Sequence, residues 1–124
     1  MKLQLDYKYK KRVLGMYSDV NYRTIIDDTL STQSALEDEQ IENIAKVLKQ
    51  NDSCIKMTMV NDYWKEMSTI ALLSRNYKNE IELYTYSINE CNIDRFKLTT
   101  GNVRKVCERI NNMVFEYIND NKGE

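Results

Sequence analysis

The chain has no histidine among its 124 residues, and this absence removes several kinds of active site. Histidine is the most frequent general base and metal ligand, and the usual partner of a serine or cysteine nucleophile. No glycine-rich phosphate loop, Cys-x-x-Cys pair or nucleophile elbow replaces it. The sequence therefore favours a non-catalytic binding protein over an enzyme, with neither a metal nor a cofactor.

Proline is also absent, and the three glycines are far apart, so no segment has the composition of an interdomain linker. The length suits one core, and we predict a single domain over residues 1–124. No segment approaches the ~18 apolar residues of a membrane span. The N-terminus lacks the apolar stretch of a secretory signal. We expect a cytoplasmic protein with no membrane partner.

The three cysteines are odd in number and far apart, at Cys54, Cys91 and Cys107. They show no metal-ligand spacing. We expect reduced thiols that pack as small hydrophobic side chains.

Strand patterns occur in several parts of the chain. Residues 2–10 alternate between apolar and polar side chains, which indicates a half-buried strand. Residues 54–60 and 81–88 are also typical of strands, and residues 13–20 favour a strand over a short helix. Residues 63–74 fit either a helix or a strand. We expect an antiparallel sheet of about four to six strands, including a central meander of three.

Two segments have apolar residues at helical spacing. The first predicts a helix near 35–50, with a capping box from Ser34 to Glu37. The second predicts a longer C-terminal helix at about 101–119, capped by Thr99 or Thr100. Its apolar stripe must be buried, most simply across one face of the sheet. The predicted class is therefore α+β.

Charge is sorted into blocks although the net charge is only −1. Residues 1–23 and 95–109 each carry a net charge of +4, whereas residues 24–45 carry six acids and no base. An acidic surface attracts a basic partner and raises the rate of association. Tyrosines at Tyr84 and Tyr86, on one face of a predicted strand, are typical of interface hot spots. The predicted partner-binding residues are therefore Asp27, Asp28, Asp38, Glu39, Glu42, Tyr84 and Tyr86.

These features predict a small non-catalytic inhibitor of a macromolecule with a basic surface. Bacterial immunity proteins, antitoxins and phage-encoded anti-defence inhibitors have this size and surface, so the class rests on analogy. The alternative is a nucleotide- or nucleic-acid-binding module that uses the basic blocks 8–12 and 95–109. Its phosphate contacts would be Lys8, Lys10, Lys11, Arg12, Arg104 and Lys105.

Overall fold

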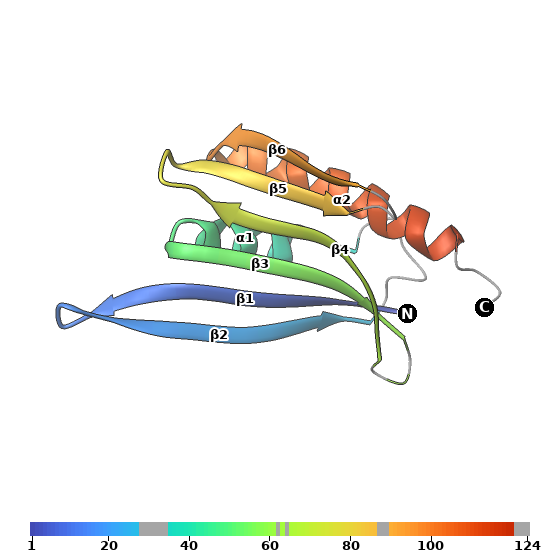
Figure 1. The fold of residues 1–124 in the computed structure, drawn as a ribbon, viewed down its shortest axis with the longest axis horizontal. Helices are drawn as coiled ribbons and strands as arrows, with labels where there is room; N and C mark the ends of the chain where they lie inside the picture. The colour runs from blue at the N-terminus through green and yellow to red at the C-terminus, as the bar shows by residue number, and fades with distance from the viewer. Residues whose placement is uncertain (28–34, 62, 64, 87–89, 121–124) are drawn as a thin grey trace.

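A computed structural model describes residues 1–27, 35–61, 63, 65–86 and 90–120. They form a six-stranded antiparallel sheet in the order β2-β1-β3-β4-β5-β6, with two helices on one side of it (Figure 1). The elements in chain order are β1 (Lys2–Val13), β2 (Met16–Ile26), α1 (Asp38–Leu48), β3 (Asn51–Val60), β4 (Glu66–Arg75), β5 (Glu80–Tyr86), β6 (Cys91–Lys97) and α2 (Thr100–Asp120). The predicted α+β class is confirmed.

The strands are explained by the alternation of their side chains. In β1, Leu3 and Leu5 are fully buried, whereas Lys8 and Lys10 are exposed. The ambiguous segment 63–74 belongs mostly to strand β4, because alternate side chains there face the core. Strand β6 was not predicted: it lies at the sheet edge, where polar residues occupy both faces and conceal the period of two.

The first helix begins later than predicted. It starts at Asp38 after the N-cap residue Glu37, whose side chain makes no capping hydrogen bond. Ser34, the start of the expected capping box, lies outside the described residues. Leu36 lies just before α1, and its backbone amide donates a hydrogen bond to the buried side chain of Asn111 on α2 at 2.7 Å. The same side chain also donates one to the Leu36 carbonyl at 3.2 Å. These bonds satisfy the backbone that a longer helix would have satisfied.

The second helix agrees with its prediction. The backbone amide of Asn102 donates to the Thr99 hydroxyl at 3.1 Å, so Thr99 caps α2. Val103, Ile110 and Val114 on its apolar stripe are buried against the sheet and α1. None of the described helices is long and apolar enough to cross a membrane.

The apolar stripe of α2 generates a first prediction. Replacing Ile110, which is fully buried, with Ala should lower the free energy of unfolding by about 2–5 kcal/mol, because it leaves a cavity in the core. Urea denaturation measures the loss. Asn112→Ala on the exposed side of the same helix is the control and should change stability by less than about 0.5 kcal/mol. Equal effects of the two changes would contradict this packing.

Candidate functional site

The two helices leave one face of the sheet uncovered, and we call this the open face. Side chains of neighbouring strands point to the same face where their residues pair, because the strand register places them opposite one another. The register therefore aligns one row of open-face side chains across all six strands: Arg23, Asp6, Lys56, Leu72, Tyr84 and Ile93. Half of this row is charged and the other half is apolar or aromatic.

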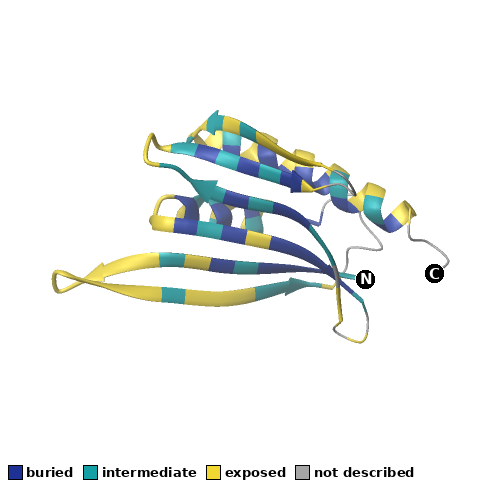
Figure 2. Cartoon of the chain, in the orientation of Figure 1, coloured by how far each residue is buried: buried dark blue, intermediate teal, exposed yellow. Residues whose placement is uncertain are grey.

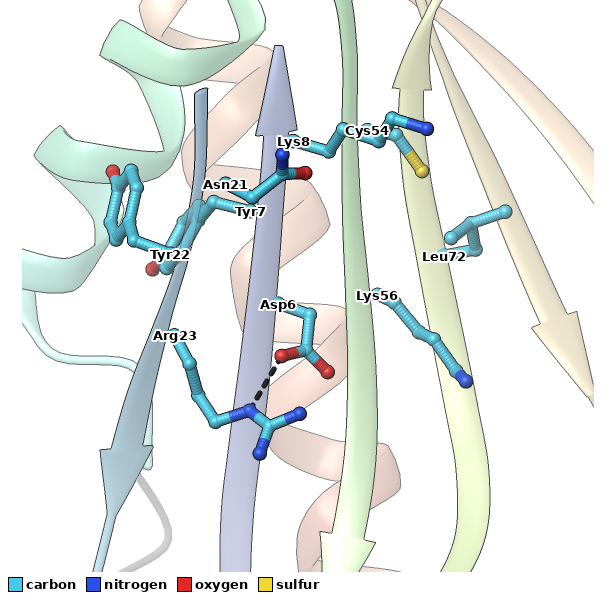
Figure 3. Close-up of a pocket in the computed structure, with 9 residues that line it drawn as sticks. All are labelled: Asp6, Tyr7, Lys8, Asn21, Tyr22, Arg23, Cys54, Lys56 and Leu72. Carbon is cyan, nitrogen blue, oxygen red and sulfur yellow. Dashed lines mark hydrogen bonds and ion pairs between the residues drawn. The ribbon is translucent and has the colours of Figure 1, made fainter. Parts of the chain in front are cut away.

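A hollow of about 550 Å³ lies over the charged half of the open face. Its lining residues are Asp6, Tyr7, Lys8, Asn21, Tyr22, Arg23, Cys54, Lys56 and Leu72, and we call it the cationic hollow (Figure 3). The side chains of Asp6, Arg23 and Lys56 lie over the strands, whereas Tyr7 and Tyr22 turn toward α1. The charged groups are three cations and one carboxylate, so the hollow favours an anionic ligand.

Two of the three cations are free to bind. Lys8 and Lys56 are exposed and have no ion-pair partner within 4.0 Å among the described residues. They come from neighbouring strands: Lys8 of β1 lies opposite Cys54 of β3, and Lys56 follows Cys54 by two residues. Exposed, unpaired ammonium groups can neutralise phosphates, and this releases the counterions condensed on a nucleic-acid backbone.

The third cation is held in place by the carboxylate. The Arg23 Nε donates to Asp6 Oδ1 at 2.7 Å, and this hydrogen bond raises the pKa of Arg23. The Gln4 amide donates to the second oxygen of Asp6 at 3.0 Å. The Arg23 terminal nitrogens have no partner among the described residues, so they remain available for an anion in a fixed orientation.

Aromatic side chains continue the open face away from the hollow. Tyr84 pairs with Leu72, which lines the hollow, and with Ile93 on the edge strand. Tyr86 follows two residues later on the same face, as the sequence predicted, and is 42% exposed. Partial burial raises the pKa of Tyr86 further above neutral pH, where an ordinary tyrosine is already uncharged. Neutral exposed rings of this kind suit stacking or apolar contact.

Several titratable side chains of the open face are partly buried or paired. Burial raises the pKa of the Cys54 thiol, which reduces the reactive thiolate. Glu82 pairs with Arg95 at 2.9 Å, and Glu80 accepts a hydrogen bond from Asn76 at 3.1 Å. Within the ranges that the structure describes, no group of three or more Cys, Asp or Glu is placed to hold a metal ion.

The predicted acidic residues do not form one patch. Asp27 follows β2 and lies 4.0 Å from the Lys2 ammonium, while Asp28 is outside the described residues. Asp38 and Glu39 line a groove of about 480 Å³ between α1 and α2, which we call the acidic groove. Its charged residues are Glu37, Asp38, Glu39, Glu108 and Arg104. Glu42 lines a separate cavity beside Tyr7, so the block is divided among three places.

The predicted basic residues are also divided. Lys8, Lys10 and Arg12 alternate along β1 toward the open face, with Lys11 between them. Arg104 and Lys105 lie on α2, on the opposite side of the sheet. Arg104 donates to Asp38 at 2.9 Å in the acidic groove, and this bond raises its pKa. The predicted contacts on α2 therefore do not share a face with those on β1, whereas Arg95 and Lys97 of the second block lie on the open face.

Of the residues that line the cationic hollow, the sequence predicted only Lys8 as a site residue, and it missed Arg23 and Lys56. Lys56 is the only base in its strand and is far from Lys8 in the sequence. The signal was its position between apolar neighbours, which indicates the solvent side of a half-buried strand. Its place opposite Asp6 and near Lys8 could be found only through the register of β1 with β3.

The cysteines give a second prediction. Burial raises the pKa of Cys107 to about 12, whereas Cys91 is exposed. Because alkylation requires the thiolate, iodoacetamide at about pH 8 should modify Cys91 first, Cys54 slowly and Cys107 only after unfolding. Mass spectrometry of the native and urea-unfolded protein measures the order. Rapid modification of Cys107 in the native protein would contradict its burial.

Comparison with known proteins gives no match to a family model, to a curated protein or to a solved structure.

Proposed function

We propose that this protein is a non-catalytic nucleic-acid-binding protein that holds a single strand on the open face of its sheet. The observation that carries the proposal is the cationic hollow, where Lys8, Lys56 and Arg23 surround an apolar floor. Single strands bind where cations follow the phosphate backbone and aromatic rings stack on the bases. Both features occur here on one continuous surface.

Phosphates would lie among the three cations of the hollow. Lys8 and Lys56 would contribute mobile charges, and the anchored Arg23 guanidinium would donate two hydrogen bonds to one phosphate. The hollow is within the range of about 300–1,000 Å³ that small-molecule sites occupy, so its volume is enough for a nucleotide.

Bases would lie on the apolar half of the same row. Leu72 forms the boundary between the two halves, and Tyr84, Tyr86 and Ile93 extend from it to the edge of the sheet. Stacking on aromatic rings depends little on base identity, because every base has a π-face. We therefore expect binding with little sequence preference.

The third prediction tests the two free lysines. Replacing both Lys8 and Lys56 with Ala should weaken binding of a fluorescein-labelled single strand of about 20 nucleotides. It should also reduce the salt dependence of log Kd by about 0.7 per lost phosphate contact. Fluorescence anisotropy between about 0.05 and 0.2 M salt measures both effects. The fold should be unaffected, because neither ammonium has an ion-pair partner among the described residues.

Lys105→Ala is the matched control, because it removes one exposed lysine from α2. It should leave affinity for the strand nearly unchanged. DNA and RNA strands of the same sequence are tested in parallel to identify the preferred backbone. The proposal fails if the natural sequence does not bind either strand, or if Lys105→Ala weakens binding as much as the double replacement of Lys8 and Lys56.

The acidic groove favours a second candidate function, inhibition of a partner with a basic surface. Four carboxylates face one guanidinium there, and only Asp38 forms an ion pair with it among the described groove residues. A lysine or arginine of the partner would enter the groove from the side opposite to the open face. The two candidates therefore use different layers of the molecule.

The fourth prediction separates the candidates with octalysine as the probe. Glu37→Gln with Glu39→Gln removes two groove charges without breaking the Asp38–Arg104 pair, and should weaken octalysine binding by calorimetry at low salt. Glu116→Gln with Asp120→Asn, at the far end of α2, is the charge-matched control. Equal losses in both double variants would show a response to net charge only, and would reject the groove as a binding site.

A further inference from the structure

The β1–β2 hairpin extends beyond the rest of the sheet. Its two strands remain paired as far as Val13 and Met16, whereas the pairing of β1 with β3 ends at Lys10 (Figure 1). Residues 11–18 therefore form a two-stranded ribbon with no third strand beside it. Almost the entire ribbon is exposed (Figure 2). A free ribbon has little core of its own, so its side chains are available to a partner.

The tip of this ribbon is apolar. Leu14 is 99% exposed, Met16 75%, Tyr17 57% and Val13 50%. Exposed apolar side chains that cluster at one protruding point indicate a contact site more strongly than scattered ones do. Within the part of the chain that the structure describes, none of these four belongs to the hydrophobic core or its partly buried margin.

The backbone at the tip is also unusual. Leu14 has φ 52° and Gly15 has φ 80°, so both central residues of the two-residue turn are left-handed. Asn-Gly is the preferred sequence for such a turn, because a branched apolar residue fits the left-handed region poorly. Leucine at this position is unfavourable both for the turn and for contact with water. A residue with two unfavourable features, and with no compensating contact to the described part of the chain, indicates a role outside the fold.

Cations connect the tip to the cationic hollow. Lys8, Lys10 and Arg12 are alternate residues of β1, so they follow one face of the ribbon outward from the hollow. Arg12 lies over the ring of Tyr17, with 5.9 Å between the guanidinium carbon and the ring centroid. Between residues 8 and 18 the chain has four bases and no acid. An anionic strand in the hollow would therefore continue along the ribbon toward its tip.

We infer that the tip is an apolar wedge that enters the base stack where a single strand joins a duplex. This inference rests on the proposed function: the hollow and cations hold the single strand, and Leu14 and Met16 insert at the first base pair. Apolar side chains of this kind separate base steps in duplexes, and a two-stranded ribbon fits the major groove. The inferred ligand is a nucleic acid with a junction between single-stranded and duplex regions.

The fifth prediction compares three probes in the full chain: a single strand of about 20 nucleotides, a duplex of about 12 base pairs, and a junction that combines them. The natural sequence should bind the junction roughly tenfold more tightly than either of the other probes. A 2-aminopurine at the first paired position should become brighter when bound, because the wedge unstacks it. Leu14→Asn should abolish both the junction preference and the brightening.

Leu14→Asn separates this role from a structural one. It creates the preferred Asn-Gly turn, so the midpoint of thermal unfolding should stay the same or rise. Tyr77→Asn is the matched control, because Tyr77 is an exposed aromatic beside Lys78 at the tip of the β4–β5 turn. This control should retain the junction preference and the 2-aminopurine signal.

Each other outcome overturns the wedge in a distinguishable way. Binding of the single strand without a junction preference rejects the wedge but leaves the proposed function intact. If none of the three nucleic-acid probes binds, both the wedge and the proposed function are rejected. Phosphatidylglycerol vesicles are the fourth probe: binding to them that is lost in Leu14→Asn, without any junction preference, would show that the tip inserts into an anionic lipid surface instead.

Discussion

Coverage of the sheet on one side only is the constraint on which the rest of this structure depends. Both helices pack on the same face, so one set of alternate strand residues forms the core there. Most residues of the other set meet solvent, although Gln4, Thr58 and Val60 in that set are buried. The core includes Leu5, Ile55 and Leu83 from three different strands. Because the side-chain period of a strand is two, a core on one face determines which residues lie on the other, except where bulges shift the register of β3 with β1 and β4. The open face is therefore a rigid surface whose charges and rings are set by the register.

The low net charge of the chain conceals a separation of charge between its two layers. The open face carries free ammonium groups at Lys8 and Lys56, and the helical layer carries the acidic groove. A net charge near zero usually argues against a nucleic-acid partner, because the phosphate backbone requires a basic surface. A phosphate backbone responds to the local surface potential, however, and this potential depends on which residues share a face and not on the net charge. Arg104 shows the difference: it belongs to a basic block in sequence and to an acidic groove in space.

The sequence predicted most of the fold and little of the candidate site, for a physical reason. Periodicity depends on residues close in sequence, so the strand at residues 2–10 and the C-terminal helix were predicted correctly. The edge strand β6 was missed because its polar side chains show no clear alternation. The cationic hollow depends on the register between strands far apart in sequence, which no local pattern contains. Tyr84 and Tyr86 were predicted to share a face because they belong to one strand. That Lys8 and Lys56 line the same hollow could be seen only in the structure.

The carboxylate of Asp6 helps to explain why the hollow suits a phosphate better than a loose collection of lysines would. An arginine on a solvated strand samples many rotamers, and a ligand must restrict that freedom when it binds. Here Asp6 holds the Nε of Arg23, and Gln4 holds the second oxygen of Asp6, so part of that restriction is already present in the free protein. The acid reduces the net charge of the hollow but converts Arg23 from a mobile charge into an oriented pair of donors. Orientation matters more than total charge for recognising one phosphate, because bidentate bonds require a fixed guanidinium plane.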